Sequence, residues 1–387
     1  MRDAVIVEAV RTPVGKGKPN GALHGEHPVD LLARTLQTLV ERAGIDPAQV
    51  DDVVGGVVTQ VGEQAINATR QAVLAAGFPE SVPATTVDRQ CGSSQQAAHF
   101  AAQGVISGAY DIAIACGVES MSRVPMGSNV LPGSDPFGKN LAGRYPEGLV
   151  GQGISAELIT ARWKLDRTDL DAFALESHRR AAAAWERGEF DREVAWTGQR
   201  DETIRPGTSL EALAGLKPAY HHPMFEERFP EITWQVTAGN ASPINDGAAA
   251  LLTMEAETAR RLGLRPRARF HSFAVVGDDP LLMLTAIIPA TEKVLARANL
   301  SLADIGLFEV NEAFSPVVLA WQHETGADLD KVNVRGGAIA IGHPLGASGA
   351  RIMTTLVHAM EDRGARYGLQ TMCEAGGLAN ATVLELL

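Results

Sequence analysis

The chain has 387 residues, of which 45% are hydrophobic and 21% are charged, and its formal net charge at pH 7 is −12. A chain of this length can bury large cores, and we expect two or three domains. The acidic balance argues against nucleic acid or an anionic membrane surface as a partner, although a few local Arg or Lys residues can still hold a phosphorylated cofactor.

The cysteine count, the metal-binding patterns and the apolar runs exclude further classes of protein. Three cysteines, Cys91, Cys116 and Cys373, are too few and too unevenly spaced for a disulfide framework. No CxxC or HExxH pattern occurs, so we expect no metal site. No apolar run reaches about 18 residues, and the opening segment does not resemble a signal peptide. We therefore expect a cytoplasmic protein with no membrane contact.

An internal repeat organises the chain. Residues 29–53 and 284–308 each contain an amphipathic helix ending in Arg-Ala, a turn, a short helical piece and an apolar strand. The same offset, within two residues, pairs the strand at 110–116 with the strand at 367–373. Two similar halves that mix helices and strands explain both pairings, which predicts an α/β protein.

The first stretch that contains a candidate reactive side chain surrounds Cys91. A strand-like run starting at Thr85 is expected to end at Cys91, and Ser93-x-x-Gln96 then matches a capping box before a helix of small apolar residues. A thiol just before a helix start meets free N–H groups and the positive end of the helix dipole, which favour the thiolate. The alternative is a buried structural cysteine, and this stretch alone does not decide between the two.

Residues 119–247 differ in character from the two halves. The segment opens with Gly, Pro and Ser around residues 126–136, continues with helical runs at 155–164 and 167–187, and closes on turn formers before a strand at 248–254. We interpret it as an insertion into the first half, and long insertions commonly carry binding surfaces.

Three stretches of the second half combine reactive side chains with turn-forming backbone. Asn311 ends an apolar strand, where it serves either as a cap or as a positioned amide. His343 stands in a Gly- and Pro-fixed turn before a helix that Ser348 is expected to cap, and Cys373 ends a strand before a Gly-rich turn. If the halves pack with matching strand ends facing one interface, these residues and Cys91 supply a nucleophile, an acid/base and oxyanion donors.

The chain resembles the thiolase family, 3-ketoacyl-CoA thiolases or acetyl-CoA acyltransferases, over nearly its whole length. The motifs Cys91-Gly-Ser-Ser-Gln-Gln-Ala and Thr371-Met-Cys-Glu also resemble actinobacterial thiolases linked to sterol breakdown. The matching pieces are Arg11-Thr-Pro-Val-Gly-Lys, Cys91-Gly-Ser, Gly117-Val-Glu-Ser-Met-Ser, Thr237-Ala-Gly-Asn-Ala-Ser-Pro-Ile-Asn-Asp-Gly, Asn311-Glu-Ala-Phe, Gly342-His-Pro-Leu-Gly and the Cys373 turn.

The resemblance implies a fold and a set of domains. It predicts the thiolase fold, an α/β arrangement of two similar mixed-sheet halves in αβαβα layers with an inserted loop domain. We expect residues 1–118 and 248–263 to form the N-terminal half, 119–247 the loop domain that binds CoA, and 264–387 the C-terminal half. It also implies a homodimer or a homotetramer.

The resemblance assigns a role to each catalytic candidate. Cys91 matches the nucleophile that becomes acylated, and Cys373 matches the residue that shuttles the proton at the α-carbon. His343 matches the group that activates the nucleophile and lends an N–H to one oxyanion hole, which Asn311 completes through a water. The main-chain N–H groups of Cys91 and Ala375 match the second hole. Such a site uses CoA as co-substrate and needs no tightly bound cofactor.

The CoA contacts are also implied by the resemblance. Arg205 falls where thiolases place an Arg near the adenine nucleotide, and Ser242 falls where a Ser meets the pantetheine. Ala238, Ala313 and Phe314 match positions that line the pantetheine tunnel. If the family resemblance is set aside, the simplest interpretation of Arg205 is an ordinary surface charge exposed to solvent.

Three departures from the family pattern concern the site. Asp88 replaces a common Asn, and Ser94 replaces a Gly. Ala375 replaces a usual Gly, which would cost about 1–2 kcal/mol if that residue must adopt a positive φ. Gly151-Gln152 stands where short-chain biosynthetic thiolases carry a His-Met pair at the acyl end of the pocket.

We therefore expect thiolytic cleavage of a 3-ketoacyl-CoA by CoA, through an acyl-Cys91 intermediate, in fatty-acid or sterol side-chain β-oxidation. The products would be an acyl-CoA and acetyl-CoA or propionyl-CoA. The alternatives are a biosynthetic acetoacetyl-CoA thiolase and a thiolase-like acyl-CoA-binding protein with weak catalysis. The sequence leaves the acyl chain and the preferred direction open.

Overall fold

A computed structural model describes residues 2–196 and 198–387. Its strands join in one sheet in the order β4-β3-β5-β6-β1-β7-β10-β9-β8, with β2 paired to β6. The strands are β1 (Ala4–Arg11), β2 (Gly15–Lys16), β3 (Asp52–Gly56), β4 (Ala84–Val87), β5 (Ile112–Ser120), β6 (Asn245–Glu255), β7 (Ala268–Gly277), β8 (Leu307–Val310), β9 (Tyr367–Glu374) and β10 (Leu378–Leu386).

Helices connect these strands and cover the sheet. The α-helices are α1 (Pro28–Ala43), α2 (Ala68–Ala75), α3 (Ser93–Ser107), α4 (Gly138–Arg144), α5 (Gln152–Arg162), α6 (Arg167–Glu186), α7 (Leu210–Ala214), α8 (Pro223–Arg228), α9 (Ala256–Arg261), α10 (Ile287–Ala298), α11 (Ser315–Thr325), α12 (Ala338–Ile341) and α13 (Ser348–Arg363). Short 3-10 helices are η1 (Pro47–Gln49), η2 (Gly62–Gln64), η3 (Met283–Ala286), η4 (Leu302–Asp304), η5 (Leu329–Lys331) and η6 (Leu345–Ala347).

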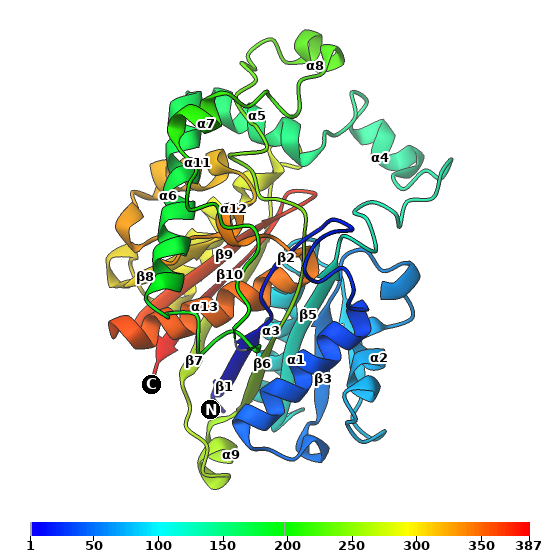
Figure 1. Cartoon of the computed structure of the whole chain (residues 1–387), viewed down its shortest axis with the longest axis vertical. Helices are drawn as coiled ribbons and strands as arrows, with labels where there is room; N and C mark the ends of the chain where they lie inside the picture. The colour runs from blue at the N-terminus through cyan, green and yellow to red at the C-terminus, as the bar shows by residue number, and fades with distance from the viewer. Residues whose placement is uncertain (1, 197) are drawn as a thin grey trace.

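The sheet consists of two similar halves that meet at β1 and β7. In the first half β3 pairs in parallel with β5, which pairs antiparallel with β6. In the second half β8 pairs in parallel with β9, which pairs antiparallel with β10. β1 and β7 join the halves through two antiparallel pairs, Val5 with Arg269 and Ile6 with Ala268. Figure 1 shows the blue first half and the orange-to-red second half side by side.

Three buried clusters show why the elements stack in layers. The apolar faces of α1 and α2 pack on one side of β3, β5, β6 and β1. The small and apolar residues of α3 and α13 fill the space between the two half-sheets. The apolar faces of α10 and α11 cover the far side of β8, β9 and β10. The result is the αβαβα order that the family resemblance implies.

The internal repeat is confirmed in the structure. The helix α1, the 3-10 helix η1 and the strand β3 recur in the second half as α10, η4 and β8. Helix α1 ends at Gly44 with φ +69°, and α10 ends at Asn299 with φ +54°. Both residue types tolerate this left-handed conformation, which explains why each copy of the helix stops after Arg-Ala.

The helices of residues 119–247 lie over one end of the sheet and beside the second half, and α5 and α6 share a buried cluster with α10 and α11. Figure 1 shows α4, α5, α7 and α8 at the top of the molecule, with α6 running down beside the second half. Strand β6, which follows this segment, lies between β5 and β1. Among the described residues, no helix is long and apolar enough to cross a membrane.

Candidate functional site

Cys91 lies in a tight turn directly before α3. Strand β4 ends at Val87, so the expectation that the strand reaches Cys91 is wrong. Gln90 adopts φ +49°, which turns the chain toward the helix. The expected capping box is also wrong, because Gly92 is the N-cap and α3 has no side-chain cap. Instead, the Ser93 hydroxyl donates to the Gln90 carbonyl over 2.6 Å and accepts from the Arg89 N–H over 2.9 Å.

The thiol of Cys91 is buried rather than exposed at the helix start. It is 4% exposed and packs with a cluster that includes Met121, Leu345 and Met372. Burial raises the pKa of Cys91 to about 12, while a hydrogen bond from Gln152 Nε2, 3.9 Å from Sγ, acts in the opposite direction. The expected lowering of this pKa by the helix start is therefore wrong for the free enzyme. Burial thus favours the protonated thiol of Cys91.

His343 is held by the backbone turn that precedes it. Gly342 adopts φ +117°, a conformation that favours glycine, and a Cβ there would lie 2.6 Å from the Asn245 side chain. The Asn245 Oδ1 accepts a hydrogen bond from the His343 N–H over 2.9 Å, and its Nδ2 donates to the Gly15 carbonyl over 2.9 Å. Residues from both halves thus fix this turn.

Hydrogen bonds also fix the tautomer of the His343 ring. Ser348 Oγ donates its one proton to the Pro344 carbonyl at 2.9 Å, so it accepts from His343 Nδ1 at 2.6 Å. Nε2 then carries the lone pair, and Asn311 Nδ2 lies 3.5 Å from it as the donor. Burial, with the Arg351 guanidinium adding to it, lowers the pKa of His343 to about 3. The ring is therefore neutral, and its Nε2 accepts a hydrogen bond from Asn311 and carries no proton.

Ser348 is a residue whose role the sequence analysis missed. It was expected to cap α13, but it is the first residue of that helix and α13 has no side-chain cap. Its hydroxyl orients the His343 ring instead. The signal in the sequence was the five-residue spacing to His343, which fits a cap equally well.

Asn311 follows β8 and lies beside β9. Its N–H donates to the Thr371 carbonyl over 3.1 Å, which places it at the end of the strand that carries Cys373. Among the described residues, its buried side-chain Oδ1 has no hydrogen-bond partner. A buried amide oxygen of this kind is satisfied by a water or by a substrate donor. Asn311 is therefore a positioned amide and not a cap.

Glu312 anchors the surroundings of Asn311. Its carboxylate accepts hydrogen bonds from Ser177 Oγ at 2.7 Å, Asn333 Nδ2 at 2.9 Å and the Ile339 N–H at 3.1 Å. These contacts tie α6 and the start of α12 to the end of β8. Since α12 leads directly into His343, Glu312 helps to set the position of the imidazole.

Cys373 lies near the end of β9, next to the hairpin of residues 375–377. It is 1% exposed, and burial together with the nearby Cys91 raises its pKa well above the ordinary value. In the hairpin, Gly376 and Gly377 adopt φ +87° and +78°, whereas Ala375 has no positive φ. The backbone strain that a positive φ would cause at Ala375 is therefore absent, because the two glycines take the left-handed positions.

A second carboxylate that the sequence analysis did not single out fixes the loops around the site. Glu119 is fully buried and accepts from the N–H groups of Val58, Thr59 and Gly346 at 3.0, 3.1 and 2.8 Å. Gln64 Nε2 donates to it over 2.7 Å. Glu119 thereby ties the loop after β3 to the loop after His343, so both halves close around Cys91.

The structure thus brings Asn311 within 3.5 Å of the His343 ring. It also places Cys91 close enough to Cys373 for a charge on Cys91 to raise the pKa of Cys373. Cys116 is different. It lies in β5 with its side chain in the cluster formed with α1 and α2. That cluster covers the outer face of the first half, so Cys116 contributes packing.

The expected CoA-contact residues fall into two groups. Ala241 and Phe314 form an antiparallel bridge, and the Ser242 N–H donates to the Ala313 carbonyl over 2.9 Å. Ala238 lies in the turn that leads into this bridge and is exposed. Arg205 is exposed on a turn held by α6, where its N–H donates to His178 Nδ1 over 3.2 Å.

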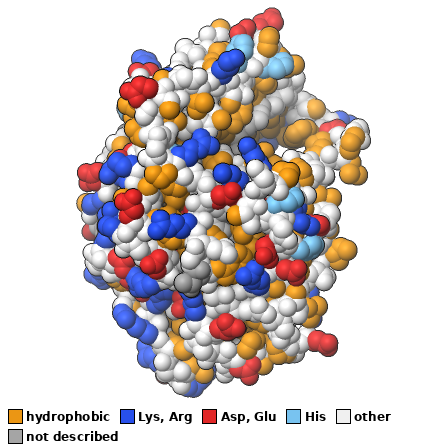
Figure 2. Space-filling model, viewed as in Figure 1, with side chains coloured by type: hydrophobic (Ala, Val, Ile, Leu, Met, Phe, Trp, Pro, Cys, Tyr) orange, Lys and Arg blue, Asp and Glu red, His pale blue; other side chains and the backbone are white. Residues whose placement is uncertain are grey.

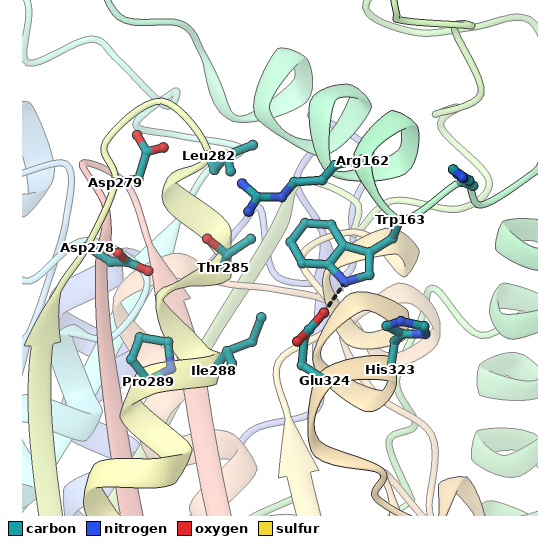
Figure 3. A pocket seen from close by; sticks show the side chains of 11 residues that line it. Arg162, Trp163, Asp278, Asp279, Leu282, Thr285, Ile288, Pro289, His323 and Glu324 are labelled. Carbon is teal, nitrogen blue, oxygen red and sulfur yellow. Dashed lines mark hydrogen bonds between the residues drawn. The ribbon is translucent and has the colours of Figure 1, made fainter.

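The surface carries no dominant charge on the face seen in Figure 2, where acidic, basic and hydrophobic side chains are interspersed. A hollow of about 610 Å³ lies between the end of α5, the loop after β7 and the end of α11. Figure 3 shows its wall, where Trp163 Nε1 donates to Glu324 over 2.8 Å. None of the catalytic candidates lines this hollow. The loop that lines it also contacts the hairpin, since the Asp278 N–H donates to the Gly377 carbonyl over 2.7 Å.

Comparisons with known proteins identify the family. The family model described as thiolase, N-terminal domain, matches residues 4–257, and the one described as thiolase, C-terminal domain, matches residues 264–386. The chain is 45% identical to steroid 3-ketoacyl-CoA thiolase FadA6 of Mycobacterium tuberculosis, covering 100% of this chain and 95% of that protein. It is 43% identical to a 3-ketoacyl-CoA thiolase of Yersinia pestis, covering 100% of both. The crystal structure of the Bacillus anthracis acetyl-CoA acetyltransferase matches with a TM-score of 0.89 at 36% identity, covering 100% of this chain and 99% of that one. The chain belongs to the thiolase family.

Proposed function

We propose that this enzyme cleaves a 3-ketoacyl-CoA with CoA, and that Cys91, His343, Asn311 and Cys373 perform the reaction. The observation that carries the proposal is the neutral His343 ring, whose Nδ1 donates to Ser348 and whose Nε2, beside Asn311, is left as a proton acceptor. A buried thiol with a raised pKa needs such a base, because it does not ionise by itself near neutral pH.

The first half-reaction transfers the acyl group to Cys91. His343 Nε2 takes the thiol proton while the sulfur attacks the C3 carbonyl of the substrate. The C2–C3 bond then breaks, and its electron pair forms the enolate of acetyl-CoA. The new Nε2–H and Asn311 stabilise the enolate oxygen, and the N–H groups of Cys91 and Ala375 stabilise the oxygen on C3. The Cys373 thiol protonates C2, which releases acetyl-CoA.

The second half-reaction regenerates the enzyme. The Cys373 thiolate takes the proton from the thiol of a CoA molecule, and the CoA sulfur attacks the thioester on Cys91. The Cys91 sulfur leaves and recovers its proton from His343 Nε2. Each residue regains a proton, Cys373 from the CoA thiol and Cys91 from His343, so the cycle balances without an oxidant or a reductant. Ping-pong kinetics follow from the covalent intermediate.

We place the substrate among the medium-to-long or bulky 3-ketoacyl-CoA thioesters, including sterol side-chain derivatives. Two supports are the names of the relatives, a steroid 3-ketoacyl-CoA thiolase and a 3-ketoacyl-CoA thiolase. The third is Gln152, which contacts Cys91 at the position where short-chain biosynthetic thiolases carry one residue of a His-Met pair. Comparing kcat/KM for acetoacetyl-CoA, longer 3-ketoacyl-CoA thioesters and steroid side-chain analogues tests this assignment. A marked preference for acetoacetyl-CoA would favour the biosynthetic role instead.

The remaining proposals concern CoA, assembly and location. The bridge between Ala241 and Phe314, with Ser242 and Ala313 beside it and Ala238 at its entrance, is proposed to line the pantetheine path, and the exposed Arg205 to meet the nucleotide end. We propose that residues 119–247 form the CoA-binding loop domain between the halves 1–118 with 248–263 and 264–387. A cytoplasmic homodimer or homotetramer completes the proposal, and light scattering distinguishes the two assemblies.

The decisive experiment is capture of the acyl-enzyme. Incubation with a 3-ketoacyl-CoA and no free CoA should release about one equivalent of acetyl-CoA per subunit and add the acyl mass to the Cys91 peptide. Cys91→Ala should show neither event, and Cys116→Ala should behave as the wild type. Intact thiolysis by Cys91→Ala would overturn the proposal.

A further inference from the structure

The carboxyl group of Glu374 is buried between the two segments that carry the cysteines. It directly follows Cys373 at the end of β9, and its side chain is fully buried. Its Oε1 lies against Gly92, the residue after Cys91, because a Cβ added to Gly92 would stand only 1.8 Å from that oxygen. The end of the Cys373 strand and the start of α3 therefore meet at this carboxyl group.

Polar contacts through Asn380 also link Glu374 to the start of α3. When the Asn380 amide on β10 is oriented so that both its atoms find partners, its nitrogen donates to Glu374 Oε1 over 3.1 Å. Its oxygen then lies 3.3 Å from the Gln96 N–H in the first turn of α3, which also donates to the Gly92 carbonyl over 2.8 Å. Among the described residues, the buried Oε2 has no hydrogen-bond partner. Glu374 thus links β9 to α3 both directly and through β10.

We propose that Glu374 is a positioning residue for the thiolase reaction: its carboxyl group holds the hairpin that carries Ala375 in register with the helix start that carries Cys91. The inference rests on the proposed function, which needs the N–H groups of Cys91 and Ala375 to converge on one substrate oxygen. The hairpin is held on its other side by the hydrogen bond from the Asp278 N–H to the Gly377 carbonyl. Glu374 supplies the contact that faces the nucleophile.

The protonation state of Glu374 gives the proposal a pH signature. Burial raises its pKa well above the ordinary value, Asp88 acts in the same direction, and Arg89 opposes them. The groups that face it are Asp88 and Arg89 from the loop before α3, the two cysteines, and the amides of Gln96 and Asn380. In its ionised form Glu374 raises the pKa of both Cys91 and Cys373. The protonated carboxyl group therefore positions the hairpin without opposing ionisation of the thiols.

Two variants separate the roles of shape and charge. At pH 7, Glu374→Gln keeps the size and the hydrogen bond, so we expect kcat within about twofold of the wild type. Glu374→Ala removes the contacts of the carboxyl group that hold the hairpin against the start of α3. We therefore expect kcat to fall by about tenfold or more while KM for the 3-ketoacyl-CoA stays within about twofold. Glu324→Gln, the same change outside the site, is the matched control with wild-type kinetics. Equal kcat in the wild type and Glu374→Ala would overturn the proposal.

A second measurement does not depend on turnover. Iodoacetamide alkylation of Cys91, followed by peptide mass spectrometry from pH 6 to 10, should be equally fast in the wild type and Glu374→Gln at low pH. Above the pKa of Glu374 the variant should react about tenfold faster, the factor for a thiol pKa difference of one unit. A rate ratio that stays constant across the range would overturn the role of the charge. Absence of thiolysis with an intact alkylation pattern would instead reject the proposed function.

Discussion

Ser348 Oγ lies 2.6 Å from Nδ1 of His343, and this contact decides which ring nitrogen carries the proton. Because the hydroxyl proton is directed to the Pro344 carbonyl, Nδ1 must donate and Nε2 must accept. The proton acceptor of the proposed mechanism is thus selected by Ser348, which is not among the proposed reacting residues. In that mechanism the same Nε2 becomes an N–H donor after it takes the Cys91 proton, so one atom would serve as base and then as oxyanion donor.

Replacement of Ser348 by Ala should impair catalysis without impairing binding. The ring loses its orienting contact and Nδ1 is left buried without a partner, so kcat should fall by about tenfold to a hundredfold while KM changes little. Steady-state thiolysis measures both constants. Ser107→Ala, an exposed serine at the end of α3, is the control, and a wild-type kcat in Ser348→Ala would contradict the tautomer argument.

Gln152 should tune the reactivity of Cys91. Its amide donates to the sulfur at 3.9 Å and lowers the pKa that burial has raised. Gln152→Ala removes this donor, so the thiolate becomes harder to form. The rate of iodoacetamide alkylation at pH 8 should fall by about threefold to tenfold. Gln322→Ala, on the outer helix α11, should leave the rate unchanged, and faster alkylation in Gln152→Ala would reverse the inferred sign.

The sequence predicts much of the fold because its signals are local. The Arg-Ala helix ends, the two paired strands and the turn formers around His343 each specify a local structure that is present in the fold. The family motifs then bring Cys91, His343, Asn311 and Cys373 to attention, although they are separated by up to 282 positions in the chain.

What the sequence does not provide is burial and orientation. A serine at a helix start fits both a cap and an orienting hydroxyl, and only the contact with His343 separates them. The helix start predicts a lowered pKa for Cys91, but burial by residues from segments distant in sequence, among them Val58 and Met372, outweighs the dipole. The same limit explains Glu119, whose four donors come from two loops that are distant in sequence.

Buried neutral histidines should make the fold acid-sensitive, and His99 provides a test. Its ring is fully buried, hydrogen-bonded to Thr382 Oγ1 at 2.7 Å and stacked on Phe273. Burial lowers the pKa of His99 from 6.5 to about 3. The unfolded chain therefore binds this proton more readily between these values, and the contribution to stability is lost as the pH falls through this range.

The comparison requires a variant without the titrating ring. His99→Gln should lose less unfolding free energy than the wild type between pH 7 and pH 5, by up to about 2 kcal/mol. Urea unfolding at both pH values measures the difference. The exposed His323→Gln should keep the wild-type difference. If His99→Gln were as acid-sensitive as the wild type, another group would be responsible.

The hairpin after Cys373 should tolerate one of two similar substitutions and be damaged by the other. Ala375 has no positive φ, so Ala375→Gly removes no strain and should change kcat by less than about twofold. Gly376 adopts φ +87° in open space, where an added Cβ meets no atom within 4 Å, so the strain in Gly376→Ala comes from the backbone alone. That substitution should lower the unfolding free energy by about 1–2 kcal/mol and displace the Ala375 N–H, with a fall in kcat. Thiolysis and urea unfolding of both variants measure these effects. A large rise in turnover in Ala375→Gly with unchanged CoA binding would contradict the geometry and favour an acyl-CoA-binding protein with weak catalysis.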